Sequence, residues 1–193
     1  MGFSFSWIAV RGLSREQVLE ALGAEVADVQ ANILEGLALF DWPEGWVIVF
    51  SDDYRDAIQG QLATLGRLAQ SAVARGFDAE KTYNVAAGYE SGHDRWSVTV
   101  NPSRRVFRVV GHPPEQLDSI VAAAKAEQAN TDVDLFFEIP AVLAESICGF
   151  RLGGGDPDAI RHVSLKRIKA ENRKPVGLGG RKPGFLARLF GQD

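Results

Sequence analysis

The chain has 193 residues with a formal net charge of −4, and it contains three histidines and a single cysteine. This length suits one ordinary domain with a sizeable hydrophobic core. The lone Cys148 excludes an intramolecular disulfide. No apolar run reaches the roughly 18 residues of a membrane-spanning helix, and the N-terminal residues lack the pattern of a secretory signal. We therefore expect a protein of the bacterial cytoplasm.

The charge is unevenly distributed along the chain. Residues 161–193 hold nine Lys or Arg against Glu171 and Asp193, a balance of +7, whereas residues 1–160 carry a balance of −11. Such segregation predicts an acidic body with a basic end.

The first elements have clear local signals. Alternating aromatic and serine residues predict a strand over Phe3–Val10. Ser14 and Gln17 form a capping-box pattern, and Gly23 supplies a stop, which together predict a short helix between them.

A hairpin and a longer helix are expected next. The apolar runs Leu37–Phe40 and Trp46–Phe50 flank a loop with Pro and Gly, which favours an antiparallel pair. Apolar residues then recur at helical spacing from Ile58 to Val73, so we expect an amphipathic helix that ends at Gly76.

Three further strands and two helices complete the expected core. The strands are Thr82–Tyr89, Trp96–Val100 and Val106–Val110, with turn residues between them. Pro113 and Pro114 mark the entrance of a helix whose apolar stripe is Leu117, Ile120, Val121 and Ala124. Pro140 fits the first turn of a last core helix.

The amino-acid composition changes after Phe150. Three glycines from Gly153 suggest a joint, and a basic helix is expected from Asp156 to about Asn172. We thus predict a single α+β domain, residues 1–152, with a largely antiparallel sheet of about six strands flanked by helices. Residues 153–193 are expected to form a linker, the basic helix and a tail.

Three ionisable residues are candidates for a catalytic site. Asp52 and Asp53 follow an apolar strand, and His93 lies in a predicted turn beside Asp94. A hydrolase or transferase site could be built around Asp52, Asp53 and His93 if they converge in space. The alternatives are a capping role for the aspartates and a solvated turn at His93. No nucleophile that would complete a catalytic set is identifiable.

Metal and cofactor signals are absent from the sequence. His112 and His162 are too far apart for a local ligand pattern, and Cys148 adds no paired ligand. The two glycine-rich stretches lack the spacing of a phosphate-binding loop. We predict neither a metal nor a cofactor.

Trp42 is the first candidate for partner binding. It stands beside Pro43 in the hairpin loop, where an aromatic side chain either anchors a partner or packs locally. Both interpretations stay open on the sequence.

Five stretches resemble an uncharacterised family of small bacterial cytoplasmic α+β proteins. They are FSFSWIAVRG, WPEGWVIVFSDDY, RWSVTV, VVGHPPEQLDSIVAAAKAEQ and VDLFFEIPAVLAESICGFRL, within residues 1–152. The resemblance implies a fold and no activity. In that family a His-Asp pair often follows the Trp-Ser-Val strand, whereas Val100 and Asn101 stand here.

The C-terminal segment forms a possible amphipathic hook, defined here as residues 182–190. If residues 184–190 became helical, one side would gather four large apolar residues, with Arg188 elsewhere on the helix and Arg181 and Lys182 just upstream. The candidate partner-binding residues of this hook are Lys182, Phe185, Leu186, Arg188, Leu189 and Phe190. So short a helix needs a surface to fold against.

The preferred hypothesis is a non-enzymatic binding or adaptor protein, including the immunity and inhibitor kinds, whose tail docks on a protein partner. One alternative is the hydrolase or transferase described above. Another is binding of nucleic acid or an anionic membrane through residues 161–193. The remaining alternative is that the hook folds back onto the acidic body and has only a structural role. The sequence identifies no small-molecule ligand.

Overall fold

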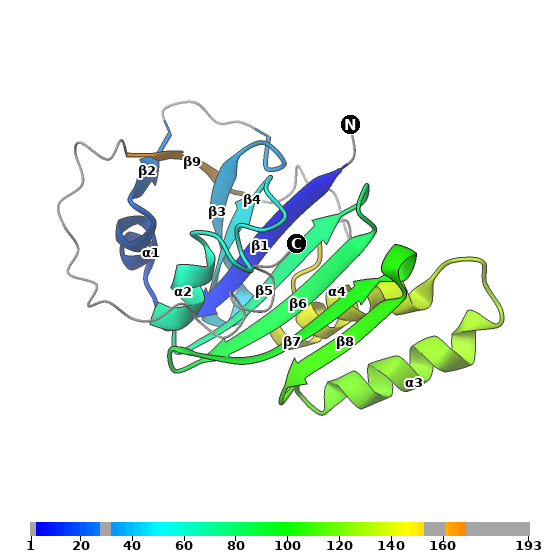
Figure 1. The fold of residues 1–193 in the computed structure, drawn as a ribbon. Helices are drawn as coiled ribbons and strands as arrows, with labels where there is room; N and C mark the ends of the chain where they lie inside the picture. The colour runs from blue at the N-terminus through cyan, green and yellow to red at the C-terminus, as the bar shows by residue number, and fades with distance from the viewer. Residues whose placement is uncertain (1–2, 28–31, 153–160, 169–193) are drawn as a thin grey trace.

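The computed structural model describes residues 3–27, 32–152 and 161–168 of the chain. The sequence-based candidates within residues 169–193, including the whole hook, lie outside these ranges. The elements in chain order are β1 (Ser4–Arg11), α1 (Arg15–Leu22), β2 (Ala24–Val26), β3 (Leu37–Trp42), η1 (Pro43–Gly45), β4 (Trp46–Ser51), α2 (Ala63–Leu68), β5 (Ser71–Asp78), β6 (Tyr83–Glu90), β7 (His93–Asn101), η2 (Pro102–Arg104), β8 (Val106–Gly111), α3 (Gln116–Gln128), α4 (Leu135–Cys148) and β9 (Val163–Arg167) (Figure 1).

The described strands form one antiparallel sheet in the order β2-β9-β3-β4-β1-β5-β6-β7-β8. All six expected strands are present, as β1, β3, β4, β6, β7 and β8, and the expected α+β architecture with a largely antiparallel sheet is confirmed. The sheet nevertheless has nine strands rather than about six. The three additional strands are β2, β5 and β9.

The expected helix from Ile58 to Gly76 is largely wrong. Only Ala63–Leu68 is helical, and the strand β5 follows at once. β5 lies between β1 and β6 and is buried on both faces, so its apolar residues do not reveal a strand by simple alternation. Gly76 is no helix stop: a Cβ there would lie 2.4 Å from the carbonyl oxygen of Tyr54, so the strand needs glycine where another segment crosses closely.

The expected basic helix is also wrong for residues 163–167. They form β9, which pairs with β2 on one side and with β3 on the other. Leu165 is buried opposite Leu37, and this burial favours the strand over the expected helix. Residues 163–167 therefore belong to the sheet.

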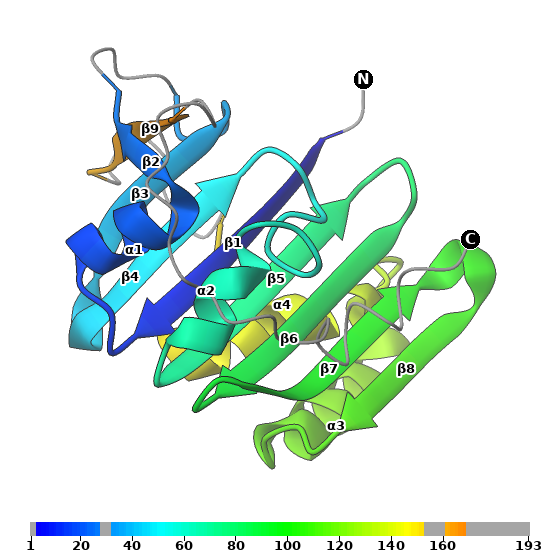
Figure 2. The same cartoon turned by 60° about the vertical axis from the view of Figure 1, so that its left-hand side comes forward.

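Helices cover both faces of the sheet, as Figures 1 and 2 show. α1 and α2 pack on one face over a core that includes Ile8, Val49 and Leu65. α4 packs on the other face across β5, β6 and β7, and α3 packs beside α4. The core under α4 contains Trp7 and Phe50 among its buried aromatic residues.

The α4 helix starts earlier than expected. Asp134 caps it, since its side chain accepts a hydrogen bond from the backbone nitrogen of Phe137 at 3.2 Å. Pro140 consequently lies inside the helix and not in its first turn. Phe150 follows the helix and is buried against the rings of Trp7, Phe40 and Trp42, which fixes the C-terminal end of α4 on the sheet.

Candidate functional site

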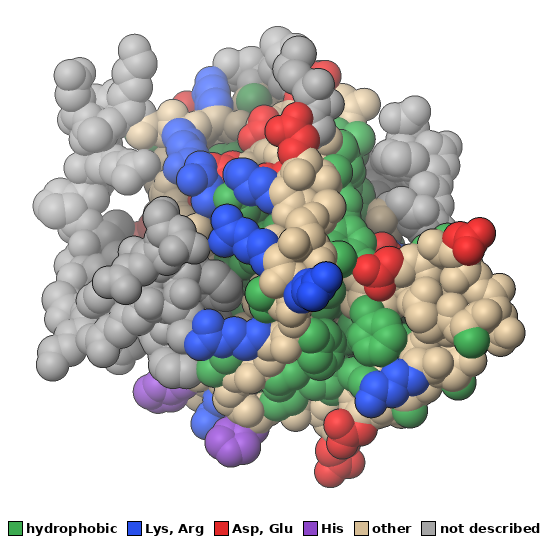
Figure 3. All heavy atoms as spheres, turned by 45° about the vertical axis from the view of Figure 1, so that its right-hand side comes forward, with side chains coloured by type: hydrophobic (Ala, Val, Ile, Leu, Met, Phe, Trp, Pro, Cys, Tyr) green, Lys and Arg blue, Asp and Glu red, His purple; other side chains and the backbone are tan. Residues whose placement is uncertain are grey.

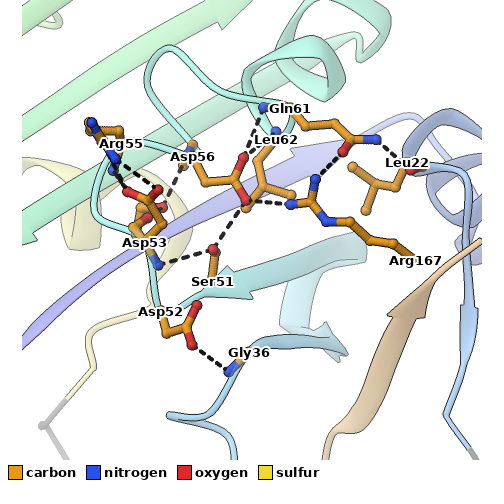
Figure 4. A network of polar contacts seen from close by, with 12 residues as sticks. Leu22, Gly36, Ser51, Asp52, Asp53, Arg55, Asp56, Gln61, Leu62 and Arg167 are labelled. Atoms are coloured by element: carbon orange, nitrogen blue, oxygen red, sulfur yellow. Dashed lines mark hydrogen bonds and ion pairs between the residues drawn. The ribbon is translucent and has the colours of Figure 1, made fainter. Parts of the chain in front are cut away.

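Asp52 and Asp53 hold the loop that follows β4 (Figure 4). The Asp52 carboxylate accepts a hydrogen bond from the backbone nitrogen of Gly36 at 3.0 Å. Asp53 accepts one from the backbone nitrogen of Arg55 at 2.9 Å, and it also pairs with the Arg55 guanidinium. Burial raises the pKa of Asp53, but these hydrogen bonds from Arg55 outweigh it and lower the pKa overall. Both aspartates therefore have structural roles in this loop.

A third aspartate, Asp56, is the most buried carboxylate of the same loop. It accepts hydrogen bonds from the Ser51 hydroxyl at 3.1 Å and from the backbone nitrogen of Gln61 at 2.8 Å. Oδ2, the oxygen that accepts from Ser51, also pairs with Arg167 of β9 at 2.9 Å (Figure 4). With these partners Asp56 connects the loop to β9, so this polar cluster stabilises the fold.

His93 lies at the opposite end of the sheet from the aspartates. Asp52 lies beside Ser4, at the start of β1. His93 pairs with Glu90 of β6, and Glu90 lies level, across β5, with Arg11 at the end of β1. The length of β1 alone separates the two ends by about 23 Å. Asp52, Asp53 and His93 do not form one site.

The remaining candidates from the sequence occupy ordinary positions. Cys148 is buried, and burial raises the pKa of its thiol to about 11. Within the described part of the chain, no group of three or more His, Cys, Asp or Glu side chains could hold a metal ion. Trp42 is half-buried, with its ring 5.1 Å from that of Phe150, so it packs locally, and its role in partner binding stays a prediction.

An apolar groove between α3 and α4 is the strongest candidate for a binding surface. It encloses about 450 Å³. Its apolar lining consists of Ile120, Ala123 and Ala124 from α3 and of Leu135, Ile139 and Val142 from α4. The two helices form a hairpin joined by a short loop, and the groove lies between them.

Two carboxylates line this groove, and the helices that form it are acidic. Glu127 and Glu138 both line it, and residues 115–145 carry seven carboxylates against Lys125 alone, a balance of −6. Glu138 pairs with Arg151 at 2.9 Å. Glu127 is exposed and makes no ion pair with any residue that the structure describes. A positive charge on an occupant would therefore meet Glu127.

Apolar surface also continues along the sheet edge next to these helices. Phe107 and Val109 of β8 are 44% and 40% exposed. They pair across the ladder with Val100 and Val98, so they face the side of the sheet that α3 and α4 cover. Figure 3 shows hydrophobic side chains on one side of this edge and Lys and Arg side chains on the other.

The sequence identified the α3 stripe but not the groove. Leu117 and Ala124 are buried as expected, whereas Ile120 is only partly covered and lines the groove. Periodicity shows that a helix has an apolar face, but it does not show how completely a neighbour covers that face. The acidic balance of residues 115–145 was the one signal that could have drawn attention to this surface.

Comparison of the chain with protein-family models, with curated proteins and with solved structures finds no match in any of the three. Within the described residues, no helix is both long enough and apolar enough to cross a membrane. The family resemblance noted from the sequence stays a prediction.

Proposed function

We propose that the chain is a non-enzymatic binding or adaptor protein, of the immunity or inhibitor kind, that holds a protein partner in the α3–α4 groove. The observation that carries this proposal is an apolar floor beside the carboxylate of Glu127, which makes no ion pair with the residues that the structure describes. The occupant that fits this chemistry is a basic amphipathic helix of the partner.

The fit follows from how helices bind in grooves. Large apolar side chains at positions i, i+3, i+4 and i+7 of a partner helix would lie along Ile120, Ile139 and Val142. Its Lys or Arg residues would face Glu127 and the other acidic side chains, which favours rapid association and a defined orientation. The C-terminal hook is a second docking element in this proposal, because it offers apolar and basic side chains to a macromolecule.

Fluorescence anisotropy tests the groove directly. The probe is a fluorescein-labelled peptide of leucine and lysine, with leucines at i, i+3, i+4 and i+7. Ala123 is an exposed groove residue, and Ala123→Arg would place a long cation in the binding space. We expect this variant to weaken peptide binding by about tenfold or more.

Ala122→Arg is the matched control, since Ala122 is an exposed neighbour on α3 that does not line the groove. It adds the same charge to the same helix and should leave the affinity within about twofold. Equal losses in the two variants would contradict docking in the groove and would indicate general attraction to an acidic protein. A peptide of the same composition with its leucines spread around the helix should bind weakly.

A second candidate function is nucleic-acid or anionic-membrane binding through residues 161–193, which the balance of +7 favours. Two of these cations already pair with the body: Lys166 lies 3.6 Å from Glu25, and Arg167 pairs with Asp56. Such binding would weaken strongly as salt is raised, and salt-insensitive binding would contradict it.

A further inference from the structure

A second hollow, of about 580 Å³, lies at the end of the sheet where β1 finishes and β4 starts. Arg11 and Trp46 line it from these two strands, and Trp96 lines it from β7. Ile147 of α4 contributes to the wall from above the sheet. The volume falls within the range of small-molecule sites, about 300–1,000 Å³. This hollow is separate from the α3–α4 groove, with which it shares no lining residue.

Gly88 of β6 allows the Trp96 indole to lie against the strand. A Cβ at Gly88 would lie 2.1 Å from Nε1 of Trp96, so the Trp96 indole lies across β6 at a position where no side chain fits beneath it. Ser71 of β5 also lines the hollow, and β5 lies between the strands that carry Arg11 and Gly88. The indole of Trp96 therefore forms part of the apolar wall of the hollow.

Two buried donors lie at the other side. The Arg11 guanidinium stands over the Trp46 ring, 4.4 Å from its centroid. Arg11 Nε and Trp46 Nε1 are both buried, and neither has a hydrogen-bond partner among the described residues. Both groups donate and cannot accept, and a buried donor without an acceptor costs about 1–3 kcal/mol. A ligand in the hollow would reach the guanidinium end of Arg11, whose side chain is 41% exposed, and not these two buried atoms.

The charged groups around the opening also leave donors available. Arg11 meets Glu44 at 3.5 Å through one terminal nitrogen, and Arg95 meets Glu90 at 3.2 Å through Nε. A guanidinium has five N–H donors, so each arginine retains further donors after its ion pair. The imidazole of His112 lines the same opening.

We propose that this hollow binds a small aromatic acid, with its ring against Trp96 and its carboxylate, sulfonate or phosphate group toward Arg11 and Arg95. The ring gains contact with an indole, and the acidic group pairs with the exposed guanidinium groups of Arg11 and Arg95. The hollow is separate from the α3–α4 groove, so the inference is independent of the proposed protein-docking function.

Tryptophan indole N–H signals in a ¹H–¹⁵N NMR titration test this site, since the chain contains four tryptophans. The probe is naphthalene-1-sulfonate, which joins a flat ring to one anionic group. We expect the signals of Trp46 and Trp96 to shift and saturate together, while that of the fully buried Trp7 stays in place. Each signal is assigned through a Trp→Phe variant.

Two control ligands separate the contribution of the ring from that of the acidic group. Naphthalene-1-methanol keeps the ring without the charge, and sodium sulfate keeps an anion without the ring; both should bind at least about tenfold more weakly than the probe. Equal binding of the alcohol would overturn the role of the donors, and equal binding of sulfate would overturn the role of the ring. The absence of any saturating shift of Trp46 and Trp96 would overturn the site.

Arginine substitutions test where the acidic group of the ligand binds. Arg11→Met should weaken probe binding by about tenfold, because it removes one charged donor set while keeping an apolar side chain. Arg95 is exposed, so Arg95→Met preserves the fold and should weaken binding in the same direction. Arg108→Met removes an exposed arginine that does not line the hollow and is the matched control. Unchanged affinity in both Arg11→Met and Arg95→Met would contradict the proposal.

Discussion

Removal of the Phe150 ring should strongly destabilise the protein, because this residue anchors the end of α4. Its side chain is 1% exposed, and its ring centroid lies 5.1 Å from Trp7, 5.4 Å from Phe40 and 5.1 Å from Trp42, in edge-on arrangements. Core Phe→Ala substitutions cost about 3–5 kcal/mol, and three aromatic contacts place this one near about 4 kcal/mol. For a chain of this size, that loss lowers Tm by about 8–16 °C.

Urea unfolding followed by tryptophan fluorescence, together with a thermal melt, measures this loss. The control is Phe107→Ala, since Phe107 is 44% exposed and its only aromatic contact among described residues is with Phe136 at 6.4 Å. We expect the control to lose less than about 1 kcal/mol. If Phe150→Ala lost no more than the control, the packing of α4 described above, and with it the position of both binding surfaces, would be refuted.

Three further predictions concern β9, the thiol and the tail. Arg167→Met should lower the free energy of unfolding by about 1–2 kcal/mol, since it leaves the carboxylate of Asp56 without its cation, and urea unfolding measures this; an unchanged stability would contradict the role given to β9. The pKa of Cys148 is raised to about 11, so its contribution to stability is complete below about pH 9 and is lost as pH rises through about 11. Wild type should therefore lose about 2–3 kcal/mol more than Cys148→Ala over this interval, and parallel pH curves would contradict it. Partner capture with wild type and with the Phe185→Ala/Phe190→Ala variant should give different partner lists if the hook docks, and identical lists would count against the hook.

The elements with strong local signals were predictable from the sequence. Ser14 and Gln17 form the capping box that the pattern indicated, and Gly23 ends the helix in a left-handed conformation. The hairpin of β3 and β4 is also present, with its Pro and Gly in the connecting turn. In these places the chemistry of neighbouring residues decides the structure.

The elements that depend on distant partners were not predictable. The sequence of β5 predicts a helix because a central strand is apolar on both faces. Only the pairing of β5 with β1 and β6 shows that it is a strand. β9 is five residues long and gains its burial by insertion between β2 and β3, which lie over 120 residues earlier in the chain. Local spacing carries no information on such pairing.

The two binding surfaces were hidden from the sequence for a similar reason. Arg11 and Trp46 are far apart along the chain and meet because their strands, β1 and β4, pair in the sheet. The groove depends on how much of Ile120 the helix α4 leaves uncovered. Each surface arises from an incomplete contact between elements, whereas sequence patterns report only which residues favour burial.

Methyl NMR of the chain with the leucine–lysine peptide tests the central claim most directly. Docking in the groove predicts that the methyl signals of Ile120, Ile139 and Val142 shift together as the peptide saturates. The methyls of Val18 and Leu62, in the core on the opposite face of the sheet, should keep their positions. Saturating peptide that left the three groove residues unchanged, or that shifted the opposite face equally, would contradict the account.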